Sequence, residues 1–253
     1  MASSLGELER QLRSISHSEE AIQAVQAFSN GLAGTKGRLE VWNAVNAIVR
    51  KPIDYGETSA LGFDTPDDQF SVLQGDIVQS EAAYFYGERI AGMPKFAVLN
   101  SSCDLVPGRT AHASLLRILP IRRGEERAKE KLGTLLKFSR RDSMYLPALP
   151  DDTEDVVGNV ISFEGICQIR TSDLFLANRT ASLSVVGWRI FASFVRTVMA
   201  RAKLRPSCVE CTKAKNTACD LSGETVSVEE SSLPLVGEMS RYKSPCVIVF
   251  CTW

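Results

Sequence analysis

Short apolar runs separated by turn residues fill the middle of this chain, and they constrain its fold more than any other feature. Short apolar runs bounded by Gly and Pro are typical of short strands joined by tight turns. The first group is Val72-Leu73 with Ile77-Val78, Tyr84 to Tyr86, Phe96 to Leu99 and Leu115 to Leu119. Strand character resumes at Met144 to Leu146 and at Val156 to Ile169. The sequence therefore predicts a sheet of short strands between about residues 72 and 170.

Helical patterns flank these strands on both sides. Ser4-x-x-Glu7 and Ser16-x-x-Glu19 have capping-box spacing, and a second amphipathic stretch is predicted to run from Leu39 to Val49 before Pro52 ends it. After the strands, Ser182 or Ser184 can cap a helix that extends to about Lys203. We expect an N-terminal helical extension over 1–52, a linker over 53–70, a strand-rich domain with a long C-terminal helix over 70–203, and a Cys-containing tail over 204–253.

Composition limits the environment and the partners. The formal net charge is −1, so no global field draws the chain onto nucleic acid and any basic surface must be local. No apolar run reaches the roughly 18 residues that a membrane span needs, and the N-terminus lacks the basic start and apolar core of a secretory signal. We therefore expect a cytoplasmic protein without membrane contact, whose seven cysteines are reduced.

Three stretches follow one another in a distinctive order: Gly75 to Val78, then Phe96 to Ser101 running on to Leu116 to Ile121, and finally Gln168 to Asp173 ahead of the last helix. Their order and character resemble the PemK/MazF family of small toxin barrels. The resemblance covers about residues 74–203 and implies an α+β fold, a small bent antiparallel SH3-like β-barrel sealed by a long C-terminal helix. It also implies a bacterial homodimer that cleaves single-stranded RNA without a metal or other cofactor, in a toxin–antitoxin or phage-defence system.

The same resemblance suggests where catalytic residues lie. Such cleavage needs a base for the 2′-hydroxyl, a cation for the phosphorane and an acid for the leaving oxygen. Arg170 and Thr171 match the family motif, and Arg122 follows the Pro-Ile pair at a position where the family usually has Thr. The candidate catalytic residues are Arg122, Arg170 and Asp104.

Several family positions carry other residues in this chain. An Arg-Pro pair is replaced by Met93-Pro94-Lys95, an acidic residue by Cys167, and a second arginine of some members by Gly165. Lys95 is the candidate for supplying positive charge from a shifted position, although lysine does not reproduce a bidentate arginine on phosphate. These departures favour an alternative function, a non-catalytic module that contacts a partner protein or nucleic acid through the barrel.

A basic segment over 122–141 is a further candidate for nucleic-acid contact. Lys and Arg clustered near a groove follow phosphates and give salt-dependent binding. The residues proposed for this contact are Lys95, Arg123, Arg140 and Arg141. A solvated helix face explains the same composition, and the sequence leaves both interpretations open.

The cysteines suggest two weaker sites. Cys103, in a Ser-x-Cys-Asp-Leu turn that also resembles uncharacterised bacterial proteins, is a candidate thiol nucleophile if His112 reaches it, or a buried residue in a turn capped by Asp104. A structural zinc site needs four ligands. Cys208, Cys211 and Cys219 have half of a zinc-knuckle spacing without a matching second pair, so we expect no metal and treat a zinc or thiol sensor as the weakest hypothesis.

Overall fold

The computed structural model describes residues 4–53 and 72–203. The chain divides into two units, Met1–Ala202 and Lys203–Trp253, and the first unit is described here by itself. Almost all of the predicted linker, the whole predicted tail and the tail cysteines Cys208, Cys211 and Cys219 lie outside the described residues.

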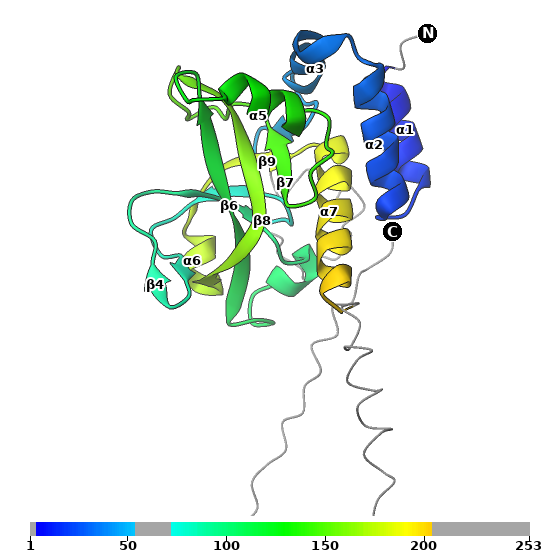
Figure 1. The fold of residues 1–253 in the computed structure, drawn as a ribbon. Helices are drawn as coiled ribbons and strands as arrows, with labels where there is room; N and C mark the ends of the chain where they lie inside the picture. Colours follow the sequence, from blue (N-terminus) through cyan, green and yellow to red (C-terminus); the bar gives the residue numbers. More distant parts are fainter. Residues whose placement is uncertain (1–3, 54–71, 204–253) are drawn as a thin grey trace, which may run out of the picture. The chain divides into compact units, whose positions relative to one another are not determined.

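The described residues form a mixed α+β structure with helices at both ends of a strand-rich middle (Figure 1). The helices are α1 Leu5–Ser14, α2 Glu19–Gly31, α3 Gly34–Trp42, η1 (a 3₁₀ helix) Ser102–Leu105, α5 Ala128–Leu135, α6 Thr171–Phe175 and α7 Val185–Lys203. The strands are β1 Val49–Arg50, β2 Ile77–Gln79, β3 Tyr84–Phe85, β4 Glu88–Arg89, β5 Lys95–Val98, β6 His112–Arg122, β7 Ser143–Leu146, β8 Val156–Arg170 and β9 Asn178–Leu183. No helix in the described part has the length and apolar character needed to cross a membrane.

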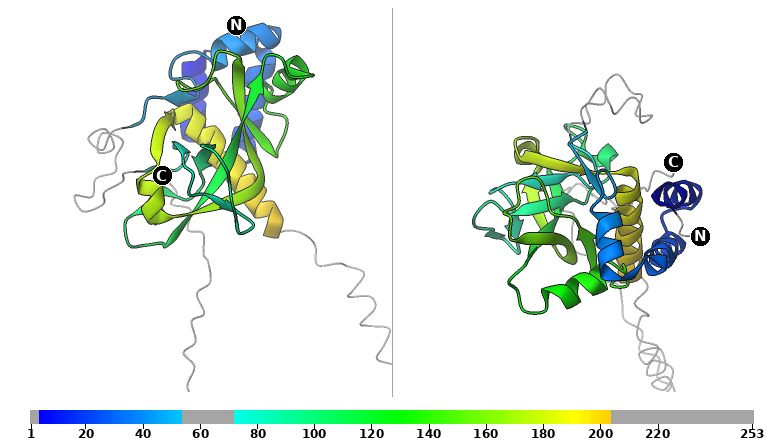
Figure 2. Two further views of the ribbon diagram at one scale, coloured as in Figure 1. Left: turned by 90° about the vertical axis from the view of Figure 1, so that its left-hand side faces the viewer. Right: turned by 90° about the horizontal axis from the view of Figure 1, so that it is seen from above.

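All nine strands belong to one antiparallel sheet. The strand order is β1-β9-β2-β5-β6-β8-β3-β4, with β7 on the other side of β8. Within 4–53 and 72–203 no pairing joins the ends of this path, so the sheet is strongly bent but open (Figures 1 and 2). The motif strands β2, β5, β6 and β8 are consecutive neighbours in it.

The bend comes from a break in the pairing of the two longest strands. Leu116 pairs with Ile166 and Ile118 pairs with Ile161, so β8 advances five residues while β6 advances two. Gly165, with φ +81°, lies among the extra residues. A bulge of this kind bends the strand. It also interrupts the alternation of side chains between the two faces of the sheet, which starts anew on the other side of the bulge.

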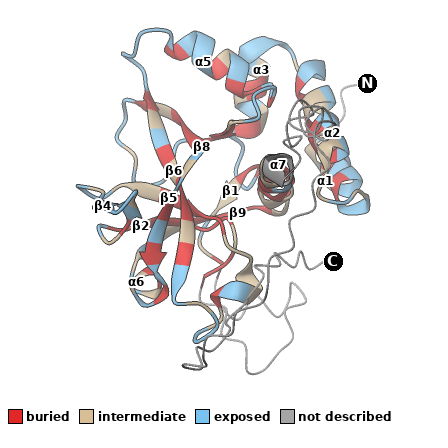
Figure 3. Ribbon diagram, turned by 60° about the horizontal axis from the view of Figure 1, so that its bottom comes forward, coloured by how far each residue is buried: buried red, intermediate tan, exposed pale blue. Residues whose placement is uncertain are grey.

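Two hydrophobic clusters lie on opposite faces of the sheet. The smaller contains Phe96, Val98, Leu115, Cys167 and Ile169, while the larger joins the other face to α7 and the N-terminal helices. Helix α7 lies between the sheet and the α1–α2 pair (Figures 1 and 2). Its residues Val186, Ile190 and Phe194 belong to the larger cluster. Figure 3 marks the buried residues of the strands in red.

Helix α7 begins where the sequence predicted. The Ser184 hydroxyl accepts the backbone N–H of Gly187 at 3.0 Å and donates to the carbonyl of Ala47 at 2.8 Å. Of the two serines predicted as caps, Ser184 fills the role, because Ser182 is the buried partner of Asp76 at 2.6 Å.

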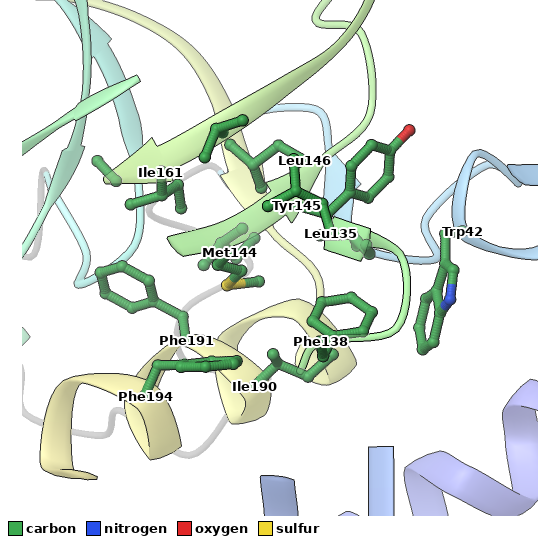
Figure 4. Packing of buried hydrophobic residues seen from close by; sticks show 14 of the residues in the cluster. Trp42, Leu135, Phe138, Met144, Tyr145, Leu146, Ile161, Ile190, Phe191 and Phe194 are labelled. Carbon is green, nitrogen blue, oxygen red and sulfur yellow. The ribbon is translucent and has the colours of Figure 1, made fainter. Parts of the chain in front are cut away.

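The N-terminal helices share the main core with the sheet. Trp42 of α3 is fully buried and lies edge-on to Phe138, with ring centroids 5.0 Å apart (Figure 4). The Gln26 amide donates to the carbonyl of Phe138 at 2.8 Å, and the Ser29 hydroxyl donates to the carbonyl of Leu136. These contacts fasten α2 to the segment between α5 and β7.

The predicted helix from Leu39 to Val49 is wrong beyond its first turn. Helix α3 ends at Trp42, Val45 is 91% exposed, and Asn46 has φ +62°. Val49 and Arg50 form strand β1, paired with β9. A long-range partner overrides the helical pattern, because the Ile48 carbonyl accepts the N–H of Ser184 at 2.8 Å.

Gly187 allows α7 to approach β1 closely. A Cβ at this position would lie 2.1 Å from the carbonyl oxygen of Ile48. We predict that Gly187→Ala lowers the free energy of unfolding by about 3 kcal/mol, because backbone rather than a flexible side chain must move.

The matched control is Gly124→Ala, where an added Cβ meets nothing within 4 Å. Its effect on stability is expected to be within about 1 kcal/mol. Urea unfolding of the three proteins checks this prediction, and equal midpoints for Gly187→Ala and the wild type would contradict it.

Candidate functional site

The predicted catalytic residues do not converge. Arg170 pairs with His112 at the first residue of β6, whereas Arg122 is the last residue of that strand. Ten residues of extended chain separate these ends by roughly 30 Å. Asp104 lies in η1, in the connection between β5 and β6 that leads to His112. Arg122 therefore cannot act with Arg170 on one phosphate.

Most of the predicted basic residues are held by carboxylates. Arg122 pairs with Asp155 at 2.6 Å, and this ion pair raises the pKa of the arginine. The Thr153 hydroxyl first, and then Arg122, lower the pKa of Asp155. Arg140 forms a two-pronged pair with Asp142, at 2.9 and 2.5 Å, which lowers the pKa of that carboxyl. Arg141 pairs with Glu19 of α2 at 2.6 Å. Their charge is locally neutralised.

The segment over 122–141 forms a groove of mixed charge instead of a basic stripe. A cavity of about 390 Å³ lies between α5 and the outer face of β8. Glu126, Glu130 and Glu164 line it together with Arg127 and Lys131. This groove has no excess of positive charge to attract a phosphate backbone.

Lys95 lies in a network that fastens the loop between β7 and β8. Its ammonium contacts Asp151 at 2.8 Å and also Asp152, and the lysine side chain is only 13% exposed. Asp152 further accepts the side-chain amide of Asn159 and the backbone N–H of Leu149, each at 2.7 Å. Lys95 is therefore a structural cation.

A continuous polar patch occupies one face of β3, β8 and β6. Tyr84 lies opposite Gln168, Gln168 lies opposite Ser114, and Arg170 lies opposite His112. Residues paired in this way point to the same face. Tyr84, Gln168, Arg170 and His112 are exposed and Ser114 is half-buried, while the alternating residues on the other face are core. We call these five residues the Tyr84–Arg170 patch.

The patch is built on rigid strands. The N–H of Ser114 donates to the Asn100 side chain at 2.5 Å, which fixes the end of β5 beside it. Behind the patch, burial raises the pKa of the Cys167 thiol, so this residue is a core side chain. Within residues 4–53 and 72–203, no ion pair joins Arg170 to a carboxylate.

An aromatic hairpin borders the patch. Strands β3 and β4 are joined by Tyr86 and Gly87, with φ +51° and +85°, and Tyr86 is 90% exposed. Phe85 packs over Gly165, where an added Cβ would lie 2.6 Å from the Phe85 ring. Gly165 is thus covered by an aromatic ring.

The Ser-x-Cys-Asp-Leu turn is closed by its own backbone contacts. Arg109 donates to the carbonyl of Cys103 at 3.0 Å, and Thr110 donates to the carbonyl of Asp104 at 3.0 Å. Cys103 is half-buried, and Asp104 is exposed. Thr171, which matches the family motif, is buried at the start of α6. Within the described ranges, no three His, Cys, Asp or Glu side chains gather as a metal site.

Comparison with known proteins adds no relative. No protein-family model matches this chain, and no curated protein matches it.

The sequence alone indicates Arg170 as a site residue, His112 only as a partner for Cys103 and Gln168 only as part of a motif, and it does not single out Tyr84 or Ser114. Their signal is alternation: exposed positions at His112 and Ser114 alternate with buried Ala113 and Leu115 on β6. Single polar residues in alternating strands are common, and only the register shows that those of three strands lie side by side.

The network around Lys95 gives a test of its structural role. We predict that Lys95→Met lowers the free energy of unfolding by about 3 kcal/mol, because it leaves the nearly buried Asp152 carboxylate without its cation. Thermal or urea unfolding measures the change.

The matched control is Arg122→Met, which removes an ion pair whose side chains are both about half exposed. Such a pair contributes little, so stability should stay close to that of the wild type. Equal losses in the two variants would show that Lys95 has no special role in the fold.

Proposed function

We propose that this protein binds single-stranded RNA on the Tyr84–Arg170 patch. One observation carries the proposal: five side chains from three adjacent strands present an aromatic ring, a guanidinium, an imidazole, an amide and a hydroxyl on one exposed face. Single-stranded nucleic acid is bound by this combination, with bases stacked on aromatic rings and phosphates held by arginine.

Four of the five patch residues have a role in binding. Tyr84 offers a face for a base, with Tyr86 at the hairpin tip as a second aromatic surface. Arg170 takes the phosphate, since it alone of the predicted catalytic arginines lacks a carboxylate partner in the described part of the chain. Gln168 and Ser114 offer hydrogen bonds to base edges or to the 2′-hydroxyl.

We also propose that the fold is a diverged, PemK/MazF-like one. The three motifs that carry the resemblance lie on β2, β5, β6 and β8, which are neighbours in one strongly bent sheet, and a long helix follows them. This kinship supports RNA as the target and a bacterial, cytoplasmic setting such as toxin–antitoxin or phage defence.

Binding is tested with a fluorescently labelled single-stranded RNA of mixed sequence, followed by anisotropy at several salt concentrations. Tyr84→Ala should weaken binding by about tenfold through loss of stacking. Arg170→Ala should weaken binding and reduce the slope of log K against log salt by roughly one.

The control is Arg122→Ala, at the far end of β6, which should leave affinity and salt slope unchanged. Equal affinity of all three variants would exclude the patch. Absence of RNA binding, with capture of a defined protein through the same residues, would instead support the alternative of a protein-binding module.

RNA cleavage is a second candidate function, and a specific observation favours it. His112 lies directly opposite Arg170, so an acid–base group and a cation are cross-strand neighbours. An imidazole can remove the 2′-hydroxyl proton as that oxygen attacks phosphorus, while the guanidinium stabilises the phosphorane, without a metal. The bond to the 5′-oxygen then breaks, and this oxygen takes its proton from the imidazolium or from water.

Incubation of the protein with a long RNA in EDTA, followed by mapping of the ends, tests cleavage. His112→Gln should abolish cleavage while binding stays within about twofold, because the base acts on the reaction rather than on affinity. Intact RNA at high protein concentration would leave binding alone as the function, and cleavage unaffected by His112→Gln would exclude this mechanism.

A further inference from the structure

His17 lies in the turn between α1 and α2 and contacts α7. Its ring meets the indole of Trp188 edge-on, with centroids 4.7 Å apart and an interplanar angle of 83°. The Nδ1 atom of His17 is buried without a hydrogen-bond partner. A buried polar atom without a partner destabilises the contact, because water would satisfy it in an open state.

Arg189, the next residue of α7, shares this contact. Its guanidinium carbon lies 5.5 Å from the Trp188 ring centroid, and its Nη1 donates to the carbonyl of Ile15 at 3.4 Å. The Nε atom of Arg189 is also buried without a partner. Two unsatisfied polar atoms therefore occur on the two sides of one junction.

The charges that act on His17 are all positive. Arg189 and Arg196 of α7 act on the imidazole, and Arg13 of α1 acts on Arg189. The acidic residue that begins α2, Glu19, is held by Arg141. Burial first, and then the two arginines, lower the pKa of His17 to about 4, and they outweigh a backbone hydrogen bond at Arg189 that acts to raise it.

Helix α2 begins at this turn without a side-chain cap. Ser18 is the N-cap of α2 but makes no side-chain capping bond, and the first backbone bond of that helix, from the N–H of Ile22 to the carbonyl of Ser18, is long at 3.4 Å. An uncapped helix start frays more readily than a capped one.

We propose that the His17 contact is an acid-sensitive fastening, which releases the α1–α2 turn from α7 when the pH falls. Protonated imidazole beside two arginines is unfavourable in the closed contact, whereas in the open turn it is hydrated and distant from them. The closed state is fully favoured above the ordinary histidine pKa of 6.5, and this advantage is lost as the pH falls from 6.5 toward 4.

The size of the effect follows from linkage. With a pKa of about 4 in the contact and 6.5 outside it, lowering the pH from 7 to 5 shifts the opening equilibrium by up to about 20-fold. Hydrogen exchange over residues 22–25, which begin with the first hydrogen-bonded amide of α2, corrected for the intrinsic pH dependence of exchange, should therefore lose up to about 20-fold of its protection in the full-length protein.

Two variants separate this mechanism from general acid instability. The chain has two histidines, His17 and His112. His17→Gln should remove the acid-dependent loss of protection, because glutamine does not titrate. His112→Gln should keep it, since His112 lies on the exposed patch and far from the turn.

The pKa of His17 can also be measured directly in the wild-type protein, so this test does not depend on the folding of a variant. In the wild-type protein, the NMR signal of the His17 ring should titrate well below pH 6.5. The proposal is overturned if both histidine signals titrate at the ordinary value, or if His17→Gln loses protection between pH 7 and 5 as the wild type does.

Discussion

The break in the β6–β8 ladder is the constraint on which the rest of the structure depends. Before the break along β8, Val160, Ile161 and Phe163 belong to the core around α7. After the break, Cys167 and Ile169 belong to the second cluster. Because the alternation of faces restarts at the bulge, one strand contributes to two cores. The same restart leaves Gln168 and Arg170 outside both cores.

The elements that sequence predicted well are those with local signals. Strand β8 and helix α7 have long, regular patterns, and Ser184 supplies a cap within the chain itself. Strand β9 was missed because its residues, Asn178 to Leu183, are largely polar. It is buried by pairing with β1 and β2, and Ser182 is satisfied by Asp76, a residue 106 positions away.

The candidate site was predicted less well, because composition does not reveal the partner of a charge. Lys95 was selected for its positive charge, yet Asp152, 57 residues later, neutralises it. The same is true of Arg122 and Asp155, which the register of two strands brings together. Arg170 was selected from a motif, and only the strand order placed Tyr84 and His112 beside it.

Strand β4 ends one side of the open sheet, and its form bears on whether copies of the protein could polymerise through that side. It is only two residues long, both exposed, and Arg89 is engaged with Glu81 at 3.3 Å. An incoming strand would find few backbone partners and would have to dehydrate an ion pair. Although the sheet is open, its edge at β4 is therefore a poor template for the addition of strands from other copies.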